Sequence, residues 1–137
     1  MTKRSQTRRA SLEVTLFGKE QSFIAIVDSG NLLRDPLSGK SVIVLDSKRC
    51  EGFVSGKLLR CVRAGELAEL GSLPEGYADK IRLIPASTAL GDGVMVALNP
   101  ERIIIKDAKG FHSADALVAI SNIDGEVGAI VPASLMT

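Results

Sequence analysis

The residues best suited to chemistry stand in one short segment, where an apolar run ends in a carboxylate, a hydroxyl and a glycine. The run is Phe23–Val27, and Asp28, Ser29, Gly30 and Asn31 follow it. A buried strand would hold the carboxylate rigidly at the floor of a cleft, and the glycine would let the backbone turn back sharply. The hydroxyl could donate a hydrogen bond to an opposite loop. The pattern therefore predicts a fixed carboxylate that can act as a general base.

Apolar residues followed by Asp, then Thr or Ser, then Gly are the arrangement of the aspartic proteases. These enzymes need two carboxylates that share one proton, and the chain has one such loop. Asp92 has no apolar strand leading into it, and Asp124 is followed by Gly125 with no hydroxyl residue between them. A catalytic version must therefore be a symmetric homodimer in which Asp28 meets its two-fold mate. The same triplet also forms ordinary turns, so the strand before it carries much of the argument.

The sequence contains few residues that could support other kinds of catalysis or bind a metal ion. The two cysteines, Cys50 and Cys61, lack the spacing of a metal motif, and His112 is the only histidine. A zinc site would need more ligands, so neither a metal nor a cofactor is expected. The thiols are expected to be free in a reducing cytosol. His112 is predicted to lie on a surface turn within Lys109–Ser113, and Asp35 is expected to cap its own turn rather than join catalysis.

The elements that must position these residues are mostly strands. Leucine and valine at helical spacing predict two short helical pieces within Val54–Leu70, and Pro132 is expected in the first turn of another short helix. A turn is expected at Gly18–Glu20. Seven stretches predict strands: Leu12–Phe17, Ser22–Val27, Ser41–Leu45, Lys80–Pro85, Gly93–Leu98, Arg102–Lys106 and Ala116–Ser121. The sequence therefore predicts an all-β barrel with one or two short helices and one lobe per chain.

The amino-acid composition and net charge restrict the class of protein further. Apolar residues make up 45% and charged residues 24% of the 137 residues, as in one folded domain. No apolar run exceeds five residues, so no segment is expected to span a membrane, and a secretory signal is not expected. A net charge of +1 and an aromatic content of 4% argue against a nucleic-acid partner.

Positive charge gathers at the start of the chain. Lys3, Arg4, Arg8 and Arg9 precede the first acidic residue. Residues 1–11 are therefore expected to form a basic, flexible segment, and residues 12–137 the folded domain. The segment is either a solvated terminus, native or added in cloning, or a polybasic stretch beside a membrane, where anionic lipid would attract it.

Over a longer stretch, Val27–Val42, the chain resembles the sporulation sigma-E factor processing peptidase family. That family shows Asp-Thr/Ser-Gly-Asn, a leucine, then Asp-Pro-Leu and a short turn into a valine-rich strand. Four later segments also resemble it: Arg82–Pro85, Leu98–Ile103, Ala119–Ser121 and Asp124–Glu126. The similarity spans about residues 12–135 in order.

The resemblance implies a function. Members join an N-terminal multi-span membrane region to a protease domain on the cytoplasmic side of the membrane. They remove the pro-sequence from an inactive sigma factor precursor during endospore formation. The resemblance implies a retropepsin-like homodimer, switched on by a signalling protein across the membrane. This chain would be either the excised protease domain or a shortened relative, and it is expected to be soluble.

The resemblance also assigns roles to residues. Asp28 would be the catalytic aspartate, and Ser29, Gly30 and Asn31 would form its loop. Retroviral-type proteases support that loop with an apolar strand, and Ala116–Ile120 is the candidate for that role. Gly91, Asp92 and Gly93 lie in a glycine-rich hairpin, which is either the flap over the cleft or an ordinary hairpin.

Two other classes stay open. The first is a catalytically silent β-barrel that binds a peptide or a protein, in which Asp28 merely turns the chain. Dimerisation away from the Asp28 loop would favour it. The second is a nucleic-acid-binding barrel that uses the basic N-terminal segment, and an affinity that falls steeply with salt would support it.

Overall fold

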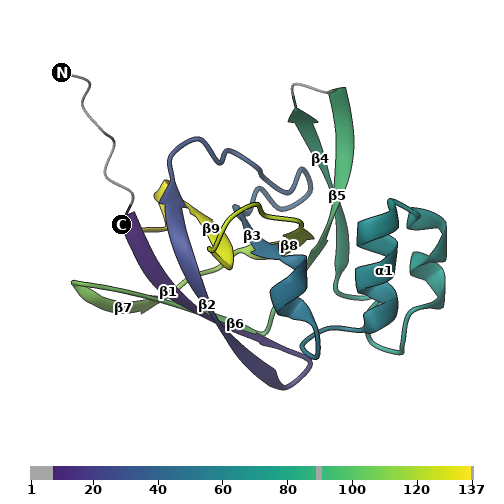
Figure 1. The fold of residues 1–137 in the computed structure, drawn as a ribbon, viewed down its shortest axis with the longest axis horizontal. Helices are drawn as coiled ribbons and strands as arrows, with labels where there is room; N and C mark the ends of the chain where they lie inside the picture. Colours follow the sequence, from purple (N-terminus) through teal and green to yellow (C-terminus); the bar gives the residue numbers. More distant parts are fainter. Residues whose placement is uncertain (1–7, 89–90, 137) are drawn as a thin grey trace.

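A computed structural model of the chain describes residues 8–88 and 91–136, and their strands form a single sheet (Figure 1). The described strands are β1 (Arg8–Leu16), β2 (Lys19–Asp28), β3 (Val42–Asp46), β4 (Ile81–Thr88), β5 (Gly91–Leu98), β6 (Arg102–Asp107), β7 (Gly110–Ser113), β8 (Leu117–Ser121) and β9 (Ala129–Pro132). Their order across the sheet is β4-β5-β8-β3-β9-β2-β1-β6-β7. The predicted all-β, single-lobe fold is confirmed.

The first hairpin joins β1 and β2. Leu12, Val14 and Leu16 alternate along β1 and are fully buried, which explains why this segment forms a strand with one face on the core. The turn consists of Phe17 and Gly18, both with positive φ (52° and 77°), as the tight turns of twisted hairpins require. The turn therefore lies one residue earlier than predicted.

The N-terminal part of β1 also departs from expectation. The strand begins at Arg8, which pairs with Val27, and it continues without interruption to Leu16. Residues 8–11 of the segment expected to be flexible are therefore paired in the sheet. The alternation that reveals the strand is clear only from Leu12 onward, because the residues before it are charged or small.

Two strands that the sequence did not predict complete the sheet. β7 pairs with β6 and contains His112, which the prediction placed on a turn. The turn lies just before it, at residues 108–109. β9 has four residues and lies between β2, to which it is parallel, and β3, to which it is antiparallel.

The helical predictions are confirmed in the middle of the chain. α1 (Gly56–Ala64) and the 3-10 helix η2 (Leu67–Ser72) are the two expected pieces. Ser55 caps α1, since its hydroxyl accepts a hydrogen bond from the Lys57 amide, and Gly65 ends it in the left-handed conformation. Two further 3-10 helices are η1 (Ser47–Cys50) and η3 (Ala133–Met136), so Pro132 ends β9 instead of starting the last helix.

The core lies on both faces of the central strands. Ile43 and Leu45 pack into the larger cluster with the β1–β2 hairpin, whereas Val42 packs into a smaller cluster with Ile84 and Leu117. Burial on both faces explains why β3 is apolar at consecutive positions. Among the described residues, no helix is long and apolar enough to cross a membrane.

Both cysteines are buried and free, as predicted. Burial raises the pKa of the Cys50 thiol to about 12, and the nearby Asp46 carboxylate acts in the same direction. This thiol therefore stays protonated at neutral pH and is a poor nucleophile.

Candidate active site

Asp28 is the last residue of β2, at the point where the chain leaves the sheet. It pairs with Pro132 of the parallel strand β9, and its side chain is half-buried. The Gly30 amide donates a hydrogen bond of 2.8 Å to Asp28 Oδ1, and the Asn31 amide donates one of 3.3 Å to the Asp28 carbonyl. These two bonds fold the loop back on the strand, and they orient one carboxylate oxygen while the other stays available.

A glycine is favoured at position 30 because a side chain there would crowd the Asp28 carboxylate, and not because of the backbone angles. A Cβ at this position would lie 3.2 Å from Asp28 Oδ1, closer than an ordinary van der Waals contact. The absence of a side chain lets the amide approach the carboxylate and donate a charge-assisted hydrogen bond. The sequence prediction of a glycine that shapes the carboxylate loop is therefore consistent with the geometry.

Asn31 fixes the loop to the neighbouring strand β3. Its Nδ2 donates to the Val42 carbonyl at 3.0 Å, and its Oδ1 accepts a hydrogen bond from the Leu33 amide at 3.2 Å. The Val42 amide in turn donates to the Leu33 carbonyl at 3.2 Å. Asn31 thus holds the chain after Asp28 in one path, in addition to lining the cleft.

The next turn is organised by Asp35, which is 2% exposed. Its carboxylate accepts hydrogen bonds from the Leu37 amide and from the amide and hydroxyl of Ser38, the last at 2.7 Å. The Ser38 hydroxyl is the main cause that lowers the pKa of Asp35. The expectation that Asp35 caps its own turn is confirmed.

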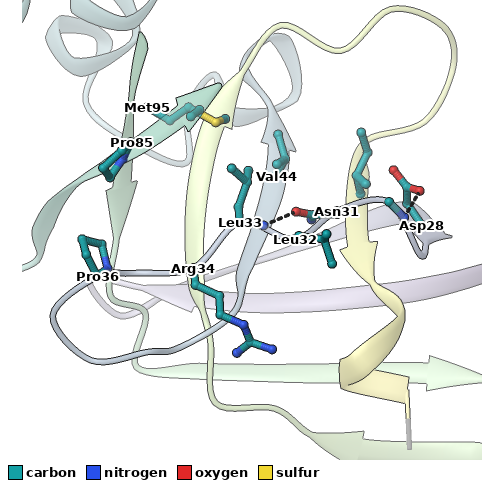
Figure 2. A pocket seen from close by; sticks show the side chains of 12 residues that line it. Asp28, Asn31, Leu32, Leu33, Arg34, Pro36, Val44, Pro85 and Met95 are labelled. Atoms are coloured by element: carbon teal, nitrogen blue, oxygen red, sulfur yellow. Dashed lines mark hydrogen bonds between the residues drawn. The ribbon is translucent and has the colours of Figure 1, made fainter. Parts of the chain in front are cut away.

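A cleft of about 650 Å³ opens beside Asp28 (Figure 2). Most of its walls are apolar, and Asp28 and Arg34 are the only charged residues among the described residues that line it. The loop after Asp28, the two floor strands and the β4–β5 hairpin supply its lining: Asp28, Gly30, Asn31, Leu32, Leu33, Arg34, Pro36, Val44, Pro85, Ala86, Met95 and Ile130. An apolar cleft with one carboxylate in its lining suits an extended peptide.

The β4–β5 hairpin forms the wall opposite the loop. Its strands pair from Ile81 and Leu98 to Thr88 and Gly91, but only Val96–Leu98 of β5 pairs with the rest of the sheet. The far half therefore projects beyond the sheet (Figure 1).

The residues predicted as a flap lie at this projecting end. Gly91, Asp92 and Gly93 begin β5, whereas the tip of the hairpin, residues 89–90, lies outside the described residues. The flap remains a prediction, although Pro85, Ala86 and Met95 of this hairpin line the cleft.

Ser29 is exposed and does not line the main cleft. It lines a smaller adjoining cavity of about 140 Å³ together with Arg34, Ser41 and Ala133. Within residues 8–88 and 91–136, the Ser29 hydroxyl has no hydrogen-bond partner. It is therefore available to a group from another molecule.

The strand beside Asp28 is not the one expected. The predicted supporting strand, Ala116–Ile120, corresponds to β8 (Leu117–Ser121), which pairs with β3 and β5 instead of β2. β9 takes the position beside β2, with Val131 opposite Val27 and Pro132 opposite Asp28. A stretch of four residues that ends in proline gives a weak strand signal, and its buried apolar residues were the only cue to it.

Other candidates lie apart from this site. His112 Nε2 is 2.7 Å from the Leu135 carbonyl, between β7 and η3. Asp124 is exposed and does not line the cleft. Among the described residues, no group of three histidine, cysteine or acidic side chains could hold a metal ion.

The fold and the site define a single-lobed all-β protein with one carboxylate in the lining of a peptide-sized cleft. The model of the peptidase U4 family, described as sporulation factor SpoIIGA, matches residues 1–125, and the chain belongs to this family. The resemblance seen in the sequence is thereby confirmed, and the chain is a sporulation-associated peptidase. No curated protein matches it significantly.

Proposed function

We propose that the chain is an aspartic endopeptidase domain that acts as a homodimer, with one Asp28 from each copy. The observation that carries the proposal is that Asp28 lines the apolar cleft, with no second carboxylate among the described residues lining it. Aspartic proteolysis needs a pair of carboxylates. A two-fold axis beside the Asp28 loop would supply the second one.

The local geometry supports such a pair. The Gly30 amide binds Asp28 Oδ1, so Oδ2 is the oxygen left to face the mate. The Ser29 hydroxyl, which has no partner among the described residues, would donate to the opposite loop. Both features favour a face that is completed by a second copy.

The proposed reaction uses the dyad as acid and base in turn. The ionised Asp28 takes a proton from a water molecule, whose oxygen attacks the peptide carbonyl carbon. The protonated Asp28 donates its proton to the carbonyl oxygen, which gives a tetrahedral diol. A proton then passes to the amide nitrogen, the C–N bond breaks, and a carboxylic acid and an amine leave. The shared proton belongs to the pair, so the apparent pKa values do too.

The proposed substrate is the pro-sequence of an inactive sigma factor precursor. Membership of a sporulation peptidase family supports this assignment, and the apolar walls of the cleft suit an extended peptide segment. In the proposal, a signalling protein activates the domain through a membrane region outside this chain by holding the two copies together, and a high protein concentration replaces that effect in the test.

The test is cleavage of a sigma factor precursor across a range of protein concentrations. Asp28→Asn should abolish cleavage, and wild-type specific activity should rise with concentration as the dimer forms. Asp124→Asn is the matched control, because Asp124 is exposed and away from the cleft.

Two results would overturn the proposal. One is cleavage of the precursor by Asp28→Asn at the wild-type rate, and the other is no cleavage by the wild type at any concentration. Binding of the precursor without cleavage, in a dimer formed away from the Asp28 loop, would favour the silent binding module instead.

A further inference from the structure

Arg34 is the one cation among the described residues that line the cleft. Apart from Asp28 and Asn31, the remaining side chains there are apolar. The Arg34 side chain is exposed as well as part of the cleft lining, so its guanidinium can meet a charged group of a bound substrate.

No carboxylate of the described chain neutralises Arg34. Six other basic side chains form the ion pairs of the described residues: Arg8, Lys40, Arg49, Arg63, Lys80 and Lys106. Asp35, the adjacent acid in the sequence, turns its oxygens toward Leu37 and Ser38. The charge of Arg34 is therefore open to an external partner.

The guanidinium is nevertheless held in place. Its Nη1 donates to the Gly39 carbonyl at 3.0 Å, and the Arg34 backbone bridges to Ser41. Gly39 is fixed in turn, because its amide donates to the Asp35 carbonyl at 2.7 Å. An arginine held this way loses little freedom when it binds a carboxylate, and its planar donors suit a two-point contact.

The loop presents two kinds of surface to a peptide. Leu33 points toward Val44 and Met95, whereas Arg34 points to the other side of the loop, as Leu32 does (Figure 2). Successive side chains of an extended peptide also point to opposite sides. A peptide running along this loop from Asp28 would meet apolar walls with some side chains and Arg34 with another.

We propose that Arg34 is a specificity residue that binds an Asp or Glu of the substrate, within an otherwise apolar segment around the scissile bond. This inference rests on the proposed function, since it concerns the peptide cleaved at Asp28. It names the substrate class as acidic-apolar peptides rather than purely apolar ones.

The experiment uses the sigma factor precursor as the probe. The scissile bond is located by sequencing the new N-terminus, and each acid within about four residues of the bond, a reach of roughly 13 Å, is changed in turn to its amide and to lysine. Rates are measured for wild type, Arg34→Gln, Arg34→Glu and the control Arg102→Gln, which removes an exposed charge outside the cleft.

One amide substitution should lower wild-type kcat/KM about tenfold, the worth of one charge-assisted contact. The same substitution should have no effect in Arg34→Gln, and Arg34→Glu should prefer the lysine substrate. Recovery of activity by that reversed pair requires a folded enzyme, so it separates recognition from a folding defect.

Two results would overturn the inference while leaving the proposed function intact. One is a cleaved bond with no acid within reach. The other is an amide substitution that lowers the rate equally in wild type and in Arg34→Gln. Failure of the wild type to cleave at all would instead remove the proposed function, and this inference with it.

Discussion

The floor strands and the projecting wall of the cleft differ in how far they are paired with the rest of the sheet and buried. The floor strand β9 is paired on both sides, and Ala129 and Val131 are fully buried. The β4–β5 hairpin is attached to the sheet through Val96–Leu98 only, and Leu83 and Val94 are about half exposed, at 48% and 50%. Asp28 ends β2, a strand that is likewise paired on both sides, whereas the wall formed by the hairpin is attached along only part of one strand.

The largest expected effect tests this contrast directly. Leu45→Ala removes a fully buried side chain from the floor and should lower the free energy of unfolding by about 3 kcal/mol. Val94→Ala, in the projecting hairpin, should cost less than about 1 kcal/mol because the side chain is half exposed. Urea unfolding measures the free energy of unfolding of both variants. Equal losses would show that the floor strands and the projecting hairpin do not differ in rigidity.

An ion pair whose carboxylate is buried should sharpen the contrast. Asp46 ends β3 with a side chain that is 1% exposed, and Arg49 Nη1 lies 2.7 Å from its Oδ2. Arg49 also donates to the Glu126 carbonyl, and the Ile123 amide donates to Asp46. Arg49→Met leaves the carboxylate buried without its cation and should cost about 2 kcal/mol, measured by urea unfolding.

The matched control is the ion pair of Lys40 with Asp115, whose carboxylate side chain is 81% exposed. Lys40→Met should cost less than about 1 kcal/mol, since water solvates the charge that remains. If both variants lose the same stability, the Asp46 pair does not anchor the loop that leads into the floor strand.

The substitution Gly30→Ala should have a smaller effect, which lowers the activity and leaves the free energy of unfolding nearly unchanged. Gly30→Ala places a Cβ 3.2 Å from Asp28 Oδ1, so the carboxylate must shift from its hydrogen bond with the amide. Precursor cleavage should fall about tenfold, as for other small misplacements of a reacting group. Gly71→Ala is the control, because a Cβ there meets nothing within 4 Å.

Equal cleavage by Gly30→Ala and wild type would show that the close approach is unnecessary for function. A large loss of unfolding free energy would instead mean that Gly30 stabilises the floor as a whole. Either outcome would separate the geometry of the carboxylate from the rigidity of the strand that carries it.

The sequence predicted the constrained part of the molecule better than its connections. The strands β1, β2 and β3 carry long apolar or alternating patterns, and such patterns predict local structure well. β9 was missed because four residues give too little periodicity, and its role depends on pairing with a strand about a hundred residues away.

The candidate site divides in the same way. Asp28, Ser29 and Gly30 form a local motif, so their types and spacing alone predict a candidate site. Ile130 and Met95, which also line the cleft, come from distant strands, and nothing in their own neighbourhoods points to a site. Sheet order, which no local pattern encodes, decides that they line the same cleft as Asp28.

The smallest expected effect lies in the turn beside the cleft and depends on pH. The Ser38 hydroxyl, the leading cause, lowers the pKa of Asp35 below its usual value of 3.8. A lowered carboxyl pKa stabilises the fold above 3.8, and that contribution is lost as the pH falls through the folded-state pKa. Ser38→Ala should therefore destabilise the protein slightly at neutral pH, and the difference from wild type should shrink in acid. Urea unfolding across this range measures it, and a difference that stays constant with pH would show that the hydroxyl acts through packing instead.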